Sequence, residues 1–273
     1  MKKFNKFKNS DDKGFELRPE KEVERDQHFL INEDVLKKEI EISNISEDDK
    51  IIEIGSGRGI LTEELSIRCS RVLSFEIDKK FKKELEKIEK RNKNIIFIFD
   101  NALNYNWKGY NKLVSNIPYS LSEPVMNRLI NSEIKEAILI VGENFKNLLM
   151  FQKTKVGILT NIFFKVKPIM FVGRECFNPS PRIDSWLIKM TRREKINSIQ
   201  KIMQDILRKE GKLKNSLLYA LINSGKTKNQ SREMIKLLNI SPRTLEKNTK
   251  KLTGNAIILI QEELQKLYKS TNE

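Results

Sequence analysis

Two periods of apolar residues run along the chain and divide it into two parts. From about residue 50 to residue 142, short apolar runs rich in β-branched residues alternate with segments whose apolar positions lie three and four residues apart. Such runs are typical of buried strands, and such segments are typical of amphipathic helices. We therefore expect strands at residues 50–54, 71–77, 94–100, 112–115 and 137–142, with helices at residues 59–68 and 79–91. This alternation indicates an α/β fold with a parallel sheet and helices on both of its faces.

The segments on either side of this region are less regular. Upstream, Asn32 or Asp34 can cap a helix that we expect to run to about Ser43. Downstream, the helical period fades over residues 158–173, where β-branched and aromatic residues dominate. That composition predicts antiparallel strands that complete the sheet, with residues 186–190 as their partner.

From about Glu194 onward, apolar residues follow helical spacing. Ser241 and Pro242 form a typical helix start, with serine as the cap and proline at the first helical position. The sequence thus predicts a small all-helical C-terminal domain. The expected organisation is a basic N-terminal arm over residues 1–20, an α/β domain over residues 21–192 and a helical domain over residues 193–273.

The charge of the chain is strongly positive and unevenly distributed. Of a formal net charge of +15, residues 186–273 carry +11, because 19 Lys and Arg there face 8 Asp and Glu. Such a balance favours a polyanionic partner, with nucleic acid ahead of a membrane surface. A compositional bias towards lysine would instead give only a solvated surface. Because the charge is concentrated in the helical part, we expect that part to bind nucleic acid.

Several classes of protein are disfavoured by the composition. No apolar run approaches the length of a membrane span, and the first 14 residues lack the apolar core of a signal peptide, so we expect a cytoplasmic protein without membrane contact. Cys69 and Cys176 show no metal-ligand spacing. His28 is the only histidine, which excludes a histidine-dependent triad and a histidine-rich metal site, and we expect no bound metal.

The first candidate for chemistry is a glycine-rich turn between a strand and a helix. Glycines stand at alternate positions, at Gly55, Gly57 and Gly59. They allow the backbone to approach a ligand closely and direct helix N-terminal N–H groups at it. The dinucleotide fingerprint needs its third glycine one residue later, where this chain has Ile60. The turn therefore suggests a nucleotide-like ligand without an NAD-type pyrophosphate, although a turn that merely packs a helix on the sheet has the same appearance.

Two acidic residues follow the next two strands. Glu76 ends the second strand, 21 residues after Gly55, where its carboxylate can accept hydrogen bonds from both hydroxyls of a ribose. Asp100 ends the third strand, where it can accept from the exocyclic amine of an adenine while the following backbone N–H contacts a ring nitrogen. A surface carboxylate at the first position and a turn cap at the second are the simpler alternatives.

The most specific motif is Asn116-Ile117-Pro118-Tyr119, directly after the fourth strand. Asn116 offers an amide oxygen, the carbonyl before Pro118 is a second acceptor, and Tyr119 supplies a flat face. Two acceptors and an aromatic plate suit a primary amine on an aromatic ring. In-line methyl transfer from a sulfonium fits these residues, because orientation can supply most of its rate gain. A base within a duplex cannot reach such a pocket, so the substrate would be single-stranded or flipped.

Six segments occur in order and at fitting spacing: QHFL (27–30), EIGSGRGILT (53–62), FEID (75–78), DNAL (100–103), NIPYSLSEP (116–124) and FNPSPRIDS (177–185). Over residues 25–190 the chain resembles the ribosomal RNA adenine dimethyltransferases of the KsgA type. The resemblance implies a Rossmann-like fold, S-adenosylmethionine as methyl donor, and cofactor contacts at His28, Leu30, Gly55, Glu76, Asp100 and Asn116. It also implies that Asn116, Pro118 and Tyr119 hold the target adenine while Phe177 stacks on its other face.

The same resemblance implies two adjacent adenines in a small-subunit rRNA hairpin as the target, each methylated twice, on rRNA or a pre-30S-like particle. The basic helical tail also resembles the C-terminal domain of that family. We expect a monomer by default. Residues 142–157 depart from the family pattern in a part that faces RNA. A large-subunit methyltransferase of the macrolide-resistance type shares the cofactor motifs and NIPY. A non-catalytic nucleic-acid-binding protein on the same scaffold and an assembly factor with secondary methylation are further alternatives.

Overall fold

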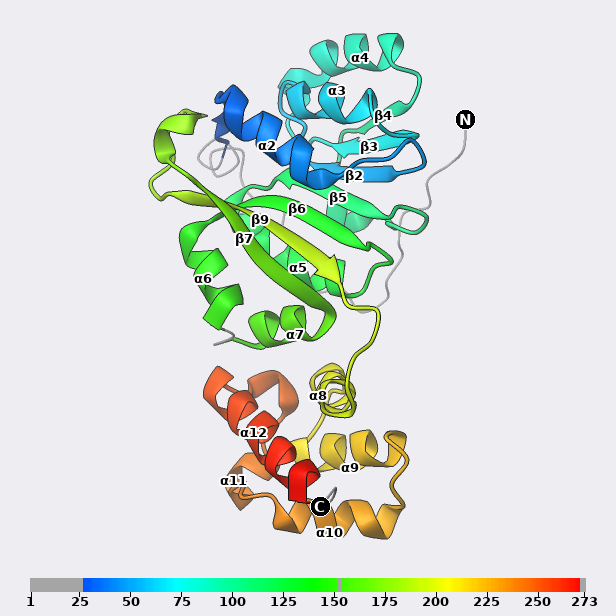
Figure 1. Cartoon of the computed structure of the whole chain (residues 1–273), viewed down its shortest axis with the longest axis vertical. Coiled ribbons are helices and arrows are strands. Elements are labelled where there is room, and N and C mark those ends of the chain that lie inside the picture. Colours follow the sequence, from blue (N-terminus) through cyan, green and yellow to red (C-terminus); the bar gives the residue numbers. More distant parts are fainter. Residues whose placement is uncertain (1–26, 152–153, 271–273) are drawn as a thin grey trace. The chain divides into compact units, whose positions relative to one another are not determined.

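The computed structural model describes residues 27–151 and 154–270 (Figure 1). It divides the chain into two compact units. One unit runs to Lys146 and resumes over Val166–Arg192, and the other combines Asn147–Lys165 with the chain from Arg193 onward. The helical unit thus takes in residues 147–165, ahead of the start expected at residue 193. The predicted basic arm at residues 1–20 lies outside the described residues.

A seven-stranded sheet forms the centre of the first unit, with the strand order β4-β3-β2-β5-β6-β9-β7. Its members are β2 (Lys50–Ile54), β3 (Arg71–Phe75), β4 (Ile95–Ile98), β5 (Lys112–Asn116), β6 (Glu136–Gly142), β7 (Phe164–Val172) and β9 (Ser185–Arg192). Neighbouring strands from β4 to β6 are parallel, and β9 pairs antiparallel with β6. The predicted parallel α/β sheet is confirmed, as is an antiparallel strand over residues 186–190.

The central strands are apolar because they are covered on both faces. Ile51 and Ile52 in β2 are fully buried, as are Val72 and Leu73 in β3. The sheet is connected through α2 (Glu33–Ser43), α3 (Ile60–Ser66), α4 (Lys82–Arg91) and α5 (Ser122–Ile130). Short 3-10 turns occur at Lys79–Phe81, Ala102–Asn104, Tyr119–Leu121 and Arg174–Cys176.

The start of α2 follows the predicted capping chemistry. The side chain of Asn32 accepts hydrogen bonds from the backbone N–H groups of Asp34 and Val35, both at 3.0 Å. These bonds satisfy two donors that have no partner inside the helix. The predicted helix, from this cap to about Ser43, is confirmed.

The prediction of strands over residues 158–163 is wrong, because this part is helical. Helix α6 spans Glu143–Phe151 and helix α7 spans Lys155–Phe163, and β7 begins only at Phe164. The Thr154 side chain caps α7 by accepting from the Gly157 N–H at 3.2 Å. Most of α7 is buried, and it packs against α8 (Ser198–Arg208). Burial in a helical environment outweighs the β-propensity of its branched residues.

The remaining helices of the second unit are α9 (Leu213–Asn223), α10 (Lys228–Leu237), α11 (Pro242–Leu245) and α12 (Gly254–Ser270), as predicted in kind. Asn197 with Gln200 and Thr227 with Gln230 form capping boxes at the starts of α8 and α10. Ser241 caps α11, with Pro242 at its first position. No helix within the described residues is long and apolar enough to cross a membrane.

A two-stranded ribbon joins the two ends of the α/β unit. Strand β1 (Phe29–Leu30) pairs antiparallel with β8 (Phe177–Asn178), so that Leu30 lies opposite Phe177. The Ile31 N–H extends the pairing to the Cys176 carbonyl at 2.9 Å. The strands are too short to be recognised from hydrophobic period, but they bring the QHFL and FNPSP motifs together.

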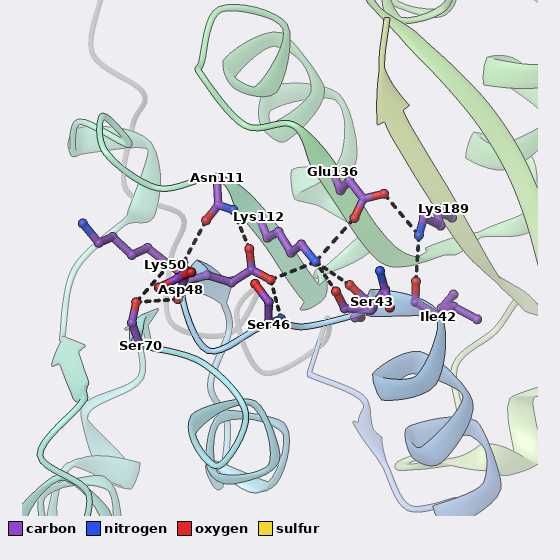
Figure 2. A network of polar contacts seen from close by, with 12 residues as sticks. Ile42, Ser43, Ser46, Asp48, Lys50, Ser70, Asn111, Lys112, Glu136 and Lys189 are labelled. Carbon is purple, nitrogen blue, oxygen red and sulfur yellow. Dashed lines mark hydrogen bonds and ion pairs between the residues drawn. The ribbon is translucent and has the colours of Figure 1, made fainter.

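The amino ends of the parallel strands are held by a buried polar network (Figure 2). The Lys112 ammonium group, at the start of β5, lies 2.9 Å from Asp49 and 3.5 Å from Glu136. It also donates to the Ser43 and Asn44 carbonyls at the end of α2, at 2.8 and 2.6 Å. Removing one partner of such a buried cluster leaves an uncompensated charge. The network fixes α2 against the sheet at the edge away from the strands' carboxyl ends.

Candidate active site

A cavity of about 520 Å³ opens at the carboxyl ends of β2, β3 and β5. This is the expected position for a ligand in a doubly wound sheet. Its lining includes every site residue that the sequence singles out: His28, Leu30, Gly55, Glu76, Asp100, Asn116, Pro118, Tyr119 and Phe177. The structure therefore brings together residues that are spread over 150 positions of the sequence.

The glycine turn passes close to the NIPY motif. Gly55 has a φ of 85°, and a Cβ atom added there would lie 3.7 Å from Pro118 Cδ and 3.9 Å from the Asn116 carbonyl oxygen. The Gly55 N–H donates to the Phe75 carbonyl at 2.7 Å, which ties the turn to β3. The left-handed backbone requires glycine here. The turn thus shapes one wall of the cavity, and Gly55 leaves its own part of that wall without a side chain.

Glu76 is almost fully buried at the end of β3 and is held by backbone donors. Its Oε2 accepts from the Gly57 N–H and its Oε1 from the Asp78 N–H, both at 2.8 Å. Burial raises the pKa of this carboxyl, while backbone hydrogen bonds from Asp78, Gly57 and Ile77 act in the opposite direction. A carboxylate has about four acceptor positions, so Glu76 can still accept from a ligand in the cavity.

Asp100 is half-buried, follows β4 by two residues and also lines the cavity. Its Oδ2 accepts from the Tyr105 hydroxyl at 3.0 Å, and its Oδ1 from the Asn101 N–H at 2.7 Å. The Asn101 N–H, which the sequence suggested as a donor to a ring nitrogen, therefore points at Asp100 itself. Ala102, the residue directly after Asn101, also lines the cavity.

Tyr119 is fixed from two sides. Its hydroxyl lies 2.6 Å from Ser185 Oγ, in the last of the sequence motifs. Its ring stacks with the His28 ring at a centroid distance of 5.9 Å and an interplanar angle of 28°. His28 Nδ1 in turn lies 2.8 Å from the Pro179 carbonyl oxygen. The imidazole therefore joins the NIPY and FNPSP motifs, a contact not expected from the sequence.

Two buried carboxyl groups near the cavity were not singled out from the sequence. Glu53, in β2, accepts from Thr62 Oγ1 at 2.5 Å and from Ser74 Oγ at 2.6 Å. Glu39, in α2, is fully buried and faces the Asn116 side chain. An acid within an apolar strand run, as in KIIEI, is a signal that could have identified Glu53. Glu39 carries no such signal, because a charged residue on a helix is usually exposed.

The carboxyl groups of Glu39, Glu53 and Glu76 disfavour one another's ionisation on this side of the cavity. Burial, with repulsion from Glu53, raises the pKa of Glu39 to about 8, and burial, with repulsion from Glu76, raises the pKa of Glu53 to about 7. A positively charged ligand would relieve this repulsion. Among the described residues, no three His, Cys, Asp or Glu side chains gather as a metal-binding group.

A family model for "Ribosomal RNA adenine dimethylase" matches residues 20–262. The chain belongs to the ribosomal RNA adenine dimethylase family. The match covers the α/β unit with its cavity and most of the helical unit, so the resemblance drawn from six short motifs is confirmed.

Curated relatives of this family carry related names. A probable ribosomal RNA small subunit methyltransferase A of Pyrococcus abyssi is 34% identical over 171 residues, which are 60% of this chain and 63% of that protein. The ribosomal RNA small subunit methyltransferase A of Fusobacterium nucleatum is 30% identical over 231 residues, covering 79% of this chain and 88% of that protein. An rRNA adenine N-6-methyltransferase of Escherichia coli is 35% identical over 177 residues, or 63% and 71% of the two chains. The chain thus spans less than two thirds of the length of its Pyrococcus relative.

Solved structures of similar fold include a dimethyladenosine transferase from Plasmodium falciparum, with a TM-score of 0.62 and 22% identity over 88% of this chain and 98% of that one. The 23S rRNA methyltransferase ErmE has a TM-score of 0.60 and 19% identity, over 87% and 99% of the two chains. Both confirm the Rossmann-like methyltransferase fold with a helical C-terminal region.

Proposed function

We propose that the chain is an S-adenosylmethionine-dependent rRNA adenine dimethyltransferase. Its substrate would be two adjacent adenosines in a small-subunit rRNA hairpin, each methylated twice at the exocyclic N6 amine. The observation that carries this proposal is the convergence of Asn116, Pro118 and Tyr119 with Glu76 and Asp100 around one cavity. Membership of the ribosomal RNA adenine dimethylase family supports it.

The residues of the cavity fit a cationic nucleoside cofactor. Glu76 keeps free lone pairs for ribose hydroxyls, and Asp100 offers a carboxylate to an adenine amine. The open backbone at Gly55 and the edges of His28 and Leu30 complete the proposed contacts. When bound, S-adenosylmethionine would supply an electrophilic methyl group on a sulfonium. The repulsion among the buried carboxyls favours such a cation over a neutral ligand.

The chain's own part in the reaction is to hold the target amine. Asn116 Oδ1 and the Ile117 carbonyl would accept its two hydrogens, which favours a pyramidal nitrogen whose lone pair is free to attack. Tyr119 would stack on the adenine, in an orientation set by its 2.6 Å bond to Ser185. Phe177, buried against the same cavity, would close the other face. Orientation of this kind can supply most of the rate, and the amine proton can leave to water after methyl transfer.

The helical unit would bind the RNA that carries the target. Basic side chains are exposed along it, among them Lys228, Arg232, Arg243, Lys247 and Lys251. Tyr219 is 44% exposed, and the Lys209 ammonium group lies 3.7 Å from its ring centroid. Exposed cations with an aromatic face suit a single strand or loop of RNA. Binding of this kind is expected to weaken steeply as salt is added.

The experiment that tests the proposal is methyl transfer from labelled S-adenosylmethionine to purified ribosomal subunits that lack the modification. We expect label in small subunits, at the N6 position of adenosine. Label in large subunits alone would favour the macrolide-resistance type of activity. If neither subunit is labelled while the protein still binds RNA, the non-catalytic alternative is supported instead.

A further inference from the structure

Glu39 lies behind the wall of the cavity, directly against Asn116. The side chain of Glu39 has no exposed surface and does not line the cavity. With the Asn116 amide nitrogen turned toward Glu39, that nitrogen lies 3.3 Å from Oε2 and 3.2 Å from Oε1. Both distances are within the range of hydrogen bonds. The carboxyl of one element, α2, thus contacts the end of β5 that lines the cavity.

A carboxyl in this position determines which end of the amide points away from it. An ionised carboxylate only accepts hydrogen bonds, so it holds the amide nitrogen and leaves the oxygen of Asn116 to face elsewhere. A protonated carboxyl keeps an acceptor oxygen but gains an O–H, and when this O–H donates to the amide oxygen, the amide nitrogen faces elsewhere. A nitrogen donor cannot accept a hydrogen from an amine. The two protonation states therefore prepare Asn116 for opposite partners.

The surroundings of Glu39 contain a second acid and no direct cation. Glu53 on β2 repels the Glu39 carboxylate, and no ion pair with Glu39 is found in residues 27–151 or 154–270. Helix α2 packs against α3, β6 and β9. Charged side chains on these elements pair elsewhere: Glu63 with Arg91, Glu64 with Arg68, and Lys189 with Glu136 and the Ile42 carbonyl.

We propose that Glu39 is a positioning residue for methyl transfer: its ionised form holds Asn116 by the amide nitrogen and so presents the amide oxygen to the target amine. Its protonated form holds the amide the other way round and disables that acceptor. The inference rests on the proposed function, in which Asn116 receives the amine. It adds a group outside the cavity that controls whether Asn116 can do so.

The switch falls in an accessible pH range. Burial and the neighbouring Glu53 raise the pKa of Glu39 to about 8. The rate of a single turnover at saturating cofactor and RNA should therefore rise with pH, by about tenfold between pH 7 and pH 9. Glu39→Gln cannot ionise, so the rate of this variant should stay constant over the same range. Glu39→Met removes the partner altogether and should lower the rate about tenfold at pH 9, with unchanged KM for both substrates.

The control is Glu41→Gln, two residues along the same helix, where the wild-type side chain is exposed and pairs with Lys38. This variant should keep the wild-type pH profile. A second measurement needs no turnover. In protein labelled with ¹⁵N on asparagine side chains, the Asn116 amide signals, identified by their loss in Asn116→Asp, should shift between pH 7 and pH 9 in the wild type and not in Glu39→Gln.

Each outcome decides between the two proposals. A wild-type protein that is inactive on both ribosomal subunits contradicts the proposed function, and the amide signals then still report on Glu39. An active wild type whose pH profile is unchanged by Glu39→Gln overturns the role of Glu39 alone. The role of Glu39 is also overturned if the Asn116 amide signals do not change between pH 7 and pH 9, or if they shift equally in Glu39→Gln.

Discussion

At the scale of single residues, the cavity depends on side chains that hold other side chains. Ser115 Oγ donates to the Ile54 carbonyl at 2.6 Å and so ties the end of β5 to β2, next to Asn116. Ser185 holds the Tyr119 hydroxyl at 2.6 Å. The strand end next to Asn116 and the Tyr119 ring are therefore held in place by serine hydroxyls. Preorganisation of this kind places acceptors before the substrate arrives.

Asn116→Ala should remove one acceptor for the amine. We expect methyl transfer to fall by at least about 100-fold, the size found when a preorganised hydrogen-bonding partner is lost. Affinity for S-adenosylmethionine should stay within about tenfold, or about 1.4 kcal/mol. Rapid-quench turnover and calorimetric titration measure the two quantities. Asn127→Ala, at an exposed position of α5, is the control and should match the wild type. Undiminished turnover in Asn116→Ala would refute the role of this residue.

The bond between Tyr119 and Ser185 can be tested from both ends. Tyr119→Phe and Ser185→Ala each break it while keeping the aromatic ring, so each should lower the turnover rate about tenfold through a less well oriented ring. Because both variants remove the same bond, the double variant should be no slower than either one. Single-turnover rates of the wild type, the two single variants and the double variant complete this double-mutant cycle. Additive losses would mean that the two side chains act independently.

At the scale of elements, glycines decide how closely neighbouring segments pack. Gly59 precedes α3 with a φ of 84°, and a Cβ atom added there would lie 2.6 Å from Ile88 Cδ1 and 3.0 Å from Leu85 Cδ2 of α4. The third glycine of the turn thus serves the contact between two helices. Gly55 and Gly57, in contrast, line the cavity.

Gly59→Ala should therefore destabilise the protein by more than the backbone strain of an alanine at positive φ. Gly109→Ala is the matched control, because Gly109 has a similar φ of 82° and nothing within 4 Å of an added Cβ. We expect about 1 kcal/mol of destabilisation for the control, and about 1–3 kcal/mol more for Gly59→Ala from overpacking. Urea unfolding measures both free energies. Equal losses of stability in the two variants would show that α3 and α4 move apart without a measurable cost in free energy.

The same scale shows which elements could be predicted. Residues 50–142 were predictable because each strand is buried on both faces and each helix has one apolar face. Residues 158–163 were not, since their branched residues favour strands and only packing against α8 makes them helical. The β1–β8 ribbon escaped prediction because its strands have two residues each. In the site, polar residues at strand ends were found, whereas Glu39 depends on a contact between distant segments.

At the scale of the whole molecule, buried acids make stability depend on pH. The pKa of Glu39 is raised from 4.5 to about 8 and that of Glu53 from 4.5 to about 7. The unfolded chain releases these protons near pH 4.5, whereas the folded chain retains them. Between pH 4.5 and about 8, the folded state therefore binds more protons than the unfolded state. The stability that these protons contribute at low pH is lost as the pH rises through this interval.

Glu39→Met should remove part of this dependence. The variant should gain stability relative to the wild type as the pH rises from 5.5 to 8.5. Only the wild type has the Glu39 carboxyl, which ionises freely in the unfolded chain but is hard to ionise when buried in the folded chain. Free energies of unfolding in urea at the two pH values provide the comparison. A constant difference between the two proteins would mean that Glu39 has an ordinary pKa in the folded state.

The central claim concerns the substrate and is tested most directly by locating the methyl groups. Small subunits lacking the modification would be incubated with the protein and S-adenosylmethionine, and their rRNA digested and mapped by mass spectrometry. We predict two adjacent adenosines in one hairpin, each carrying two methyl groups on N6, and strongly reduced methylation at the same incubation time with Asn116→Ala. Methyl groups found only in large-subunit rRNA, or at atoms other than N6 of adenosine, would contradict the proposed function.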